Sequence, residues 1–263
     1  MKSVIYLIVS FLASVAGAIC GIGGGVIIKP VLDLSRLASV STISFLSGCT
    51  VLSMSFYSVG RNFLAGESKV DMKVGTPLAI GAALGGIAGK QLFSTLKSLF
   101  ADSNSVGAVQ AFVLALVIFG TLLYTINKKK IKTYRIQSVL VCLLIGFLLG
   151  VLSSFLGIGG GPINLVVLFF FFSMKTKTAA QNSLYVIVFS QIASLLTTII
   201  TKSVPDFEWI ALILMVAGGI SGGMIGRAIN KKLDNEAVDK LFICLMVLII
   251  GICIFNSIRY SIR

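Results

Sequence analysis

Ten apolar segments follow one another along the chain, and most of them are long enough to cross a lipid bilayer as helices. Hydrophobic residues make up 57% of the sequence and charged residues only 12%, too few charges for a soluble domain. The sequence predicts an all-α polytopic membrane protein. The predicted segments are 4–20, 26–35, 38–60, 73–97, 106–126, 138–155, 162–174, 179–201, 208–229 and 239–258.

Two glycine motifs occur twice in the same order. The run Gly21–Gly25, with the sequence GIGGG, recurs at Gly157–Gly161, an offset of 136 residues. Glycines spaced four apart from Gly81 to Gly89 recur from Gly218 to Gly226, an offset of 137 residues. We expect these spaced glycines to form close helix contacts. The two offsets agree so closely that we infer an internal duplication. The expected organisation is a first transmembrane repeat over 1–126, a basic cytoplasmic linker over 127–136 and a second transmembrane repeat over 137–263.

The segments after the glycine runs, 26–35 and 162–174, are too short to cross a hydrocarbon core of about 30 Å as upright helices. Each glycine run therefore either breaks one crossing helix or forms the tip of a hairpin that returns to its starting side. With hairpins, the 22 Lys and Arg residues divide 14 to 8 between the two faces, against 12 to 10 otherwise. The positive-inside rule favours the hairpins. The halves would then be inverted repeats, with both termini outside and Lys128–Lys130 in the cytoplasm.

Several function classes are excluded by composition. The chain has no histidine, so no Ser-His triad or histidine metal cluster can form. All nine acidic residues fall in or next to predicted loops, so we expect no midplane carboxylate for a protease pair or a coupling proton. The net charge of +13 is ascribed to membrane topology and not to nucleic-acid binding. We expect no enzyme, no cofactor and no metal site.

The glycine runs are candidate anion sites. Breaking a helix in lipid frees backbone amides, which is tolerated only where protein or water lines the break. Freed N–H groups over residues 24–28 and 160–164, with a helix dipole behind them, favour an anion. The alternative is that the glycines only let two helices pack closely. The candidate ligands here are the backbones of Gly23, Gly24, Gly25, Gly159, Gly160 and Gly161, and the side-chain amide of Asn164.

Further polar candidates lie close to these runs. Gln181, Asn182 and Ser183 follow the second run and offer neutral groups that can bind an oxyanion without trapping it. Lys29 is the one cation beside a glycine run, and either substrate contact or extension to the membrane surface accounts for it. Lys90 and Arg227 obey the repeat and are expected to anchor their helices at the interface, and a role in attracting anions is the alternative.

These motifs resemble those of the TauE/SafE family of sulfite exporters over nearly the whole chain. The resemblance rests on Gly21–Gly25 with Pro30, Gly157–Pro162, the turn from Gly66 to Asp71 and the paired glycine helices. It implies the transport of anionic sulfur compounds such as sulfite or sulfonates. The segment Ala180–Ser183 departs from a Gly-Thr-Ser-like triplet that members often carry, so the substrate need not be the same.

We therefore expect a multi-pass transporter in a bacterial or archaeal plasma membrane, exporting a small anion. Its expected partners are the lipid bilayer and that anion, and the oligomeric state is left open. The alternatives are an anion channel lined by the same hairpins and a membrane assembly protein that transports nothing.

Overall fold

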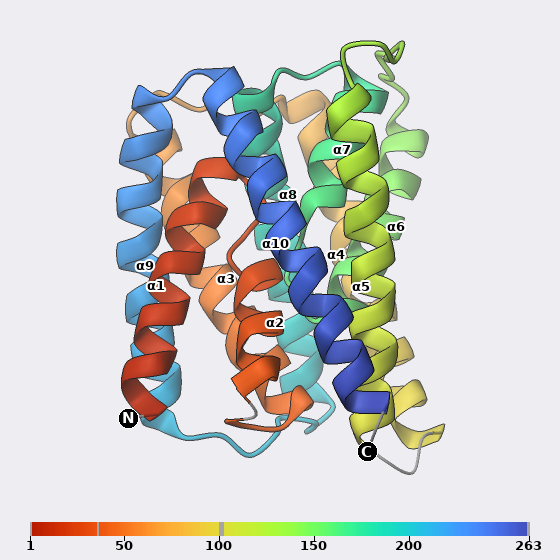
Figure 1. The fold of residues 1–263 in the computed structure, drawn as a ribbon. Coiled ribbons are helices and arrows are strands. Elements are labelled where there is room, and N and C mark those ends of the chain that lie inside the picture. Colours follow the sequence, from red (N-terminus) through yellow and green to blue (C-terminus); the bar gives the residue numbers. More distant parts are fainter. Residues whose placement is uncertain (1, 36, 100–102, 262–263) are drawn as a thin grey trace.

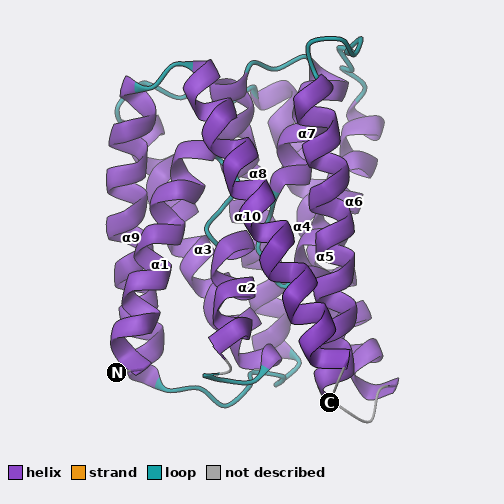
Figure 2. Cartoon of the chain, in the orientation of Figure 1, coloured by secondary structure: helices purple, strands orange, loops and turns teal. Residues whose placement is uncertain are grey.

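Ten helices joined by loops make up the described part of the chain, which contains no strand (Figures 1 and 2). The computed structural model describes residues 2–35, 37–99 and 103–261. Every predicted apolar segment is confirmed as a helix, with boundaries that agree within four residues. The helices are α1 (Lys2–Cys20), α2 (Gly25–Ser35), α3 (Val40–Leu64), α4 (Met72–Leu99), α5 (Ser103–Asn127), α6 (Val139–Leu156), α7 (Pro162–Phe172), α8 (Thr176–Ile200), α9 (Trp209–Lys232) and α10 (Asn235–Ser261).

The distribution of side chains fits a lipid environment. Eight helices are long and apolar enough to cross a membrane, while α2 and α7 have only 11 residues each. Large apolar side chains such as Leu116, Leu148 and Val247 are exposed, whereas polar residues such as Thr50 and Gln191 are buried. This distribution is the reverse of a soluble protein's, since lipid solvates apolar groups. The chain is a multi-pass, all-helical membrane protein.

The ends of the short helices α2 and α7 lie close to other parts of the bundle (Figure 1). In Figure 1, α1 rises from the end of the bundle at which α10 finishes, and α2 runs back toward that end. In the second half, the backbone N–H of Tyr134 donates to the carbonyl of Phe170 at 2.7 Å, and Ile136 donates to Phe171 at 3.0 Å. These bonds hold the end of α7 beside the linker that precedes α6.

The spaced glycines join each half of the chain to the other half. A β-carbon on Gly81, Gly85 or Gly89 of α4 would overlap the backbone of α6. Gly218, Gly222 and Gly226 of α9 lie in the same way against α1. The sequence-based interpretation of these stripes as close helix contacts is confirmed. Helix α4 thus packs against the first helix of the second half, and α9 packs against the first helix of the first half.

Candidate functional site

Both glycine runs have backbone conformations that other residues rarely adopt. The φ angles are positive at five positions, which are Gly21 (76°), Gly23 (71°), Gly157 (65°), Gly159 (72°) and Gly160 (131°). Only glycine enters this region without steric cost. Pro162 follows in the first turn of α7, where its missing N–H breaks no helical bond. The sequence GIGGG therefore ends one helix and begins the next within five residues.

The two glycine runs meet inside the bundle, although they lie 136 residues apart in sequence. A β-carbon on Gly25 would overlap the carbonyl oxygen of Ile158, and one on Gly23 would lie 4.0 Å from the carbonyl oxygen of Gly159. All four of these residues are buried. The structure thus brings the predicted backbone candidates of the two halves to one place.

Unpaired amides are present at this meeting point. In the part of the chain that the structure describes, the backbone amides of Gly23–Val26 and Gly159–Gly161 donate to no carbonyl. They lie at the amino ends of α2 and α7, where the helix dipoles place partial positive charge. The geometry can therefore favour an anion at the junction of the two runs.

Aliphatic side chains from the third helix of each half cover the runs. Val51 of α3 packs against Gly23, and Ile187 of α8 packs against Gly23 and Gly160. These two residues correspond to each other at the repeat offset of 136 residues. They form a buried cluster with Ala18, Met54 and Leu184. In this conformation, an apolar layer closes the junction from one side.

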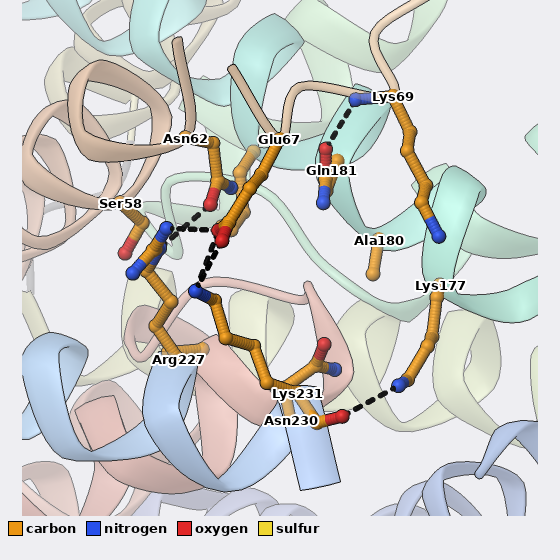
Figure 3. Close-up of a pocket in the computed structure, with 12 residues that line it drawn as sticks. Ser58, Asn62, Glu67, Lys69, Lys177, Ala180, Gln181, Arg227, Asn230 and Lys231 are labelled. Carbon is orange, nitrogen blue, oxygen red and sulfur yellow. Dashed lines mark hydrogen bonds and ion pairs between the residues drawn. The ribbon is translucent and has the colours of Figure 1, made fainter. Parts of the chain in front are cut away.

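A cavity of about 240 Å³ opens above that apolar layer, at the end of the bundle that carries the 127–136 linker (Figure 3). We name it the linker-side vestibule. Its floor includes Ala18 and Leu184, which belong to the apolar cluster, and Ala180, which packs against Gly21. The remaining lining residues are Ser58, Asn62, Glu67, Lys69, Lys177, Gln181, Arg227, Asn230 and Lys231.

A second, much smaller cavity approaches the glycine runs from the opposite end. We name it the termini-side vestibule. Its volume is about 20 Å³, which is room for about one water molecule. It is lined by Ser44, Phe45, Gly48, Lys90, Phe93, Gln110, Ser154, Gly157, Gln191, Ser194, Leu195 and Thr198.

The two vestibules are built from corresponding residues. Eight of the twelve lining residues in one match eight in the other at an offset of 136 or 137. Arg227 in the linker-side vestibule corresponds to Lys90 in the termini-side vestibule, and Ser58 corresponds to Ser194. Each vestibule thus has one cation in the corresponding place. Sequence reasoning had placed Lys90 and Arg227 at the interface as anchors, and the structure shows that they also line these cavities.

Positive charge dominates the linker-side vestibule. Among the described residues, four cations line it, namely Lys69, Lys177, Arg227 and Lys231, against the one carboxylate of Glu67. Glu67 is bound by Arg227 at 2.7 Å and by Lys231 at 2.6 Å. The hydrogen bond from Lys231 and the charges of Lys231, Arg227 and Arg61 hold the pKa of Glu67 below its usual value, against a smaller opposing effect of desolvation. A small anion would be attracted into this cavity.

The neutral candidates after the second run bind the loop that precedes α4. The side-chain oxygen of Gln181 accepts from the backbone N–H of Lys69 at 2.6 Å. Asn182 is fully buried, accepts from the N–H of Asp71 at 3.1 Å, and donates to the carbonyls of Lys69 and Thr178. Gln181 lines the linker-side vestibule, whereas Asn182 positions the loop beside it. The hydroxyl of Ser183 is buried without a partner among the described residues.

Lys29 and Asn164 lie nearer the runs. The Lys29 Cε atom is 3.4 Å from where a β-carbon on Gly157 would be, and the Asn164 Nδ2 atom is 3.6 Å from the equivalent point on Gly160. Asn164 is 3% exposed, and its Oδ1 atom has no partner among the described residues. The unpartnered oxygen is an acceptor, so only the Nδ2 group beside Gly160 could donate to an anion at the junction.

Lys29 has a buried acidic partner that sequence analysis missed. Its Nζ atom lies 2.9 Å from Oδ2 of Asp33, and the two side chains are only 3% and 5% exposed. The sequence pattern predicts Asp33 in or next to a loop, but it lies within α2 and is buried. The spacing of four residues between a lysine and an aspartate in one predicted helix was the signal that could have identified the pair.

Comparisons with known proteins place the chain in a family of membrane transporters. Residues 6–252 match the family model described as "Sulfite exporter TauE/SafE". A relative from Bacillus subtilis, named "Probable membrane transporter protein YunE", is 25% identical over 270 residues, which cover 95% of this chain and 96% of the relative. Solved structures give no significant match.

Proposed function

Because the chain belongs to the TauE/SafE sulfite exporter family of membrane transporters, we propose that it moves a small sulfur oxyanion across the membrane by alternating access. The candidate substrates are sulfite, a sulfonate or a related anion with several acceptor oxygens. One observation carries the proposal, which is the pair of corresponding vestibules that approach the glycine runs from opposite ends and differ in volume.

The unequal volumes support a transport cycle with two states. If the halves are inverted repeats, exchanging their conformations would close the linker-side vestibule and open the termini-side one. The barrier between the two vestibules would then consist of the paired glycine runs together with Val51 and Ile187. A channel needs a continuous path, and the apolar layer interrupts that path in this conformation.

The charge of the proposed substrate follows from the groups along the route. An anion entering the linker-side vestibule meets three more positive than negative side chains. At the junction it would find unpaired amides at two helix amino ends, and beyond them it would find Lys90. We propose Asn164 as a further ligand at the junction, Gln181 and Ser183 as polar groups near the entrance, and Asn182 as a residue that positions the loop.

The proposed direction is export. The end of the bundle that carries Lys128–Lys130 would face the cytoplasm by the positive-inside rule. The more open vestibule would then face the cytoplasm as well, and an inside-negative potential drives anions outward. Proteoliposomes containing the purified protein should therefore move sulfite or a small sulfonate faster when the receiving compartment is positive. If neutral or cationic solutes move and every anion in the panel fails, the proposal is wrong.

Lys90 gives a residue-level test of the proposed route. We expect Lys90→Gln to reduce anion flux by about tenfold, because a hydrogen bond to a charged group contributes roughly 1.5–3 kcal/mol. Lys97→Gln is the matched control, since Lys97 lies on the same helix but outside both vestibules. Initial rates of flux, normalised to reconstituted protein, provide the measurement. Equal rates for the two variants would show that anions do not pass Lys90.

A further inference from the structure

The carboxylate of Glu67 binds Arg227 and Lys231, two of the cations that line the linker-side vestibule (Figure 3). A carboxylate and a small sulfur oxyanion share their chemistry, since both present negatively charged oxygens to the same donors. We propose that the vestibule contains an oxyanion-binding site formed by Arg227 and Lys231, and that Glu67 is a tethered competitor which the substrate displaces. This inference rests on the proposed function. It adds a site at which the substrate first binds, and competition by Glu67 regulates that binding.

The donors are prearranged for an oxyanion. The guanidinium of Arg227 donates through Nε to the side-chain oxygen of Asn62 at 2.6 Å, which fixes the plane of the group. Its Nη2 atom donates to the carboxylate of Glu67, which also accepts from the ammonium of Lys231. A guanidinium held in this way presents its remaining N–H groups in a fixed direction. An incoming oxyanion would find the same two donors in the same positions.

A second, independent observation points to a ligand in this cavity. Ser58 lines the vestibule one helical turn before Asn62, and it is only 2% exposed. Its hydroxyl has no hydrogen-bond partner among the described residues. Buried hydroxyls are normally bonded, so this group is available to an acceptor that enters the cavity.

The carboxylate of Glu67 can leave at little cost. Its side chain is 43% exposed, and it is carried by the loop between α3 and α4. Gly66, immediately before it, has a φ of 67° and no neighbour within 4 Å of an added β-carbon. Water can therefore solvate the carboxylate as soon as another anion takes its place, and the space beside Gly66 is open.

The competitor is present on one side only. At the repeat offsets of 136 and 137 residues, the positions that correspond to Glu67 are Ser203 and Val204, and neither is acidic. Among the described residues, no acidic side chain lines the termini-side vestibule, where Lys90 corresponds to Arg227. The two vestibules should consequently bind the same anion with different affinities, and the linker-side vestibule should bind it more weakly than its cations alone would.

Removing the carboxylate tests the inference. The measurement uses full-length protein in nanodiscs, with sulfate or sulfite as the probe. We expect Glu67→Gln to lower the dissociation constant of the probe by about fivefold, which is typical of the loss of a partly exposed ion pair. Arg227→Gln should abolish the tightening when it is combined with Glu67→Gln. Glu236→Gln is the matched control, because Glu236 carries the same charge on the same end of the bundle, in an exposed pair with Lys240.

The outcomes separate this inference from the proposed function. The inference alone would be overturned if the wild type transports anions and Glu67→Gln binds them no more tightly than the wild type does. Glu67 would then have only a structural role. Failure of every anion to bind or to be transported, in both wild type and Glu67→Gln, would overturn both. Tighter binding by Glu67→Gln at an unchanged unfolding temperature would support the competitor role, because a merely structural residue would change stability and not affinity.

The pH dependence provides a further prediction. The pKa of Glu67 is lowered by Lys231, Arg227 and Arg61, so its ion pairs persist above that lowered value and are lost only when the pH falls through it. The other ionisable groups that line the cavity are Lys69 and Lys177. Between pH 7 and pH 5, sulfate affinity of the wild type should therefore stay below that of Glu67→Gln. Convergence of the two affinities in this range would contradict the assignment.

Discussion

Replacing Lys29 with methionine is expected to destabilise the protein by about 3–5 kcal/mol, because the carboxylate of Asp33 would be left buried without a counter-charge. The pair is almost completely shielded, with side-chain exposures of 3% and 5% and an Nζ to Oδ2 distance of 2.9 Å. Oδ1 of Asp33 has no other partner among the described residues, so no second donor could replace the lysine. Thermal unfolding of the detergent-solubilised protein measures the loss.

The double variant Lys29→Met/Asp33→Leu separates the pair's electrostatics from the function of Lys29. Replacing both partners with apolar residues of similar size should restore most of the stability, since neither charge then has to be desolvated. Lys240→Met is the control, because its pair with Glu236 is exposed and 4.0 Å long and should contribute little. A single variant as stable as the wild type would mean that the pair contributes nothing to folding.

The same double variant tests Lys29 as a substrate ligand. If Lys29 contacts the anion from beside Gly157, the folded double variant should lose transport. If Lys29 only balances Asp33, the double variant should transport normally. The structure favours the balancing role in the conformation described, because the ammonium is directed to Asp33.

Replacing Gly25 with alanine should abolish transport, and this is the largest effect that we expect from adding a single methyl group. The added carbon would overlap the carbonyl group of Ile158 and would lie 2.9 Å from Val51. A carbonyl in a tight turn cannot rotate away as a side chain can, so the two glycine runs would have to separate. Overpacking of this kind typically lowers the free energy of unfolding by about 1–3 kcal/mol. Here the overpacked contact is the one between the two halves of the chain. Flux in proteoliposomes and the unfolding temperature should both decrease.

Two other glycines provide graded controls. At Gly161 the added carbon would meet only the end of the Ile158 side chain, at 3.1 Å, and the backbone is extended, so Gly161→Ala should have a mild effect. At Gly251 in α10 the space is open, and alanine favours helices over glycine by about 1 kcal/mol, so Gly251→Ala should be neutral or slightly stabilising. Equal loss of flux in all three variants would rule out contact between the runs as the cause.

The sequence by itself determined the helices of this protein. In hydrocarbon each backbone must satisfy its own hydrogen bonds, so an apolar segment of sufficient length has one available structure, and all ten segments were located within four residues. The duplicated glycine stripes were also interpreted correctly, because a spacing of four residues places small side chains on one face of a helix. Pro162 lies in the first turn of α7, a position that proline favours for local reasons.

Only the tertiary structure decided which polar groups meet. Glu67 pairs with Arg227 across 160 residues, and Asn182 binds a loop 111 residues before it, so neither partner could be inferred from local spacing. Sequence reasoning placed Lys90 and Arg227 at the membrane surface and treated Asp33 as a loop residue, since it had no information on what packs around them. Few polar groups are available in a membrane bundle, and each must bond whatever the packed helices bring within reach. The residues that line each vestibule are therefore determined by how the two halves pack against each other, and not by either half alone.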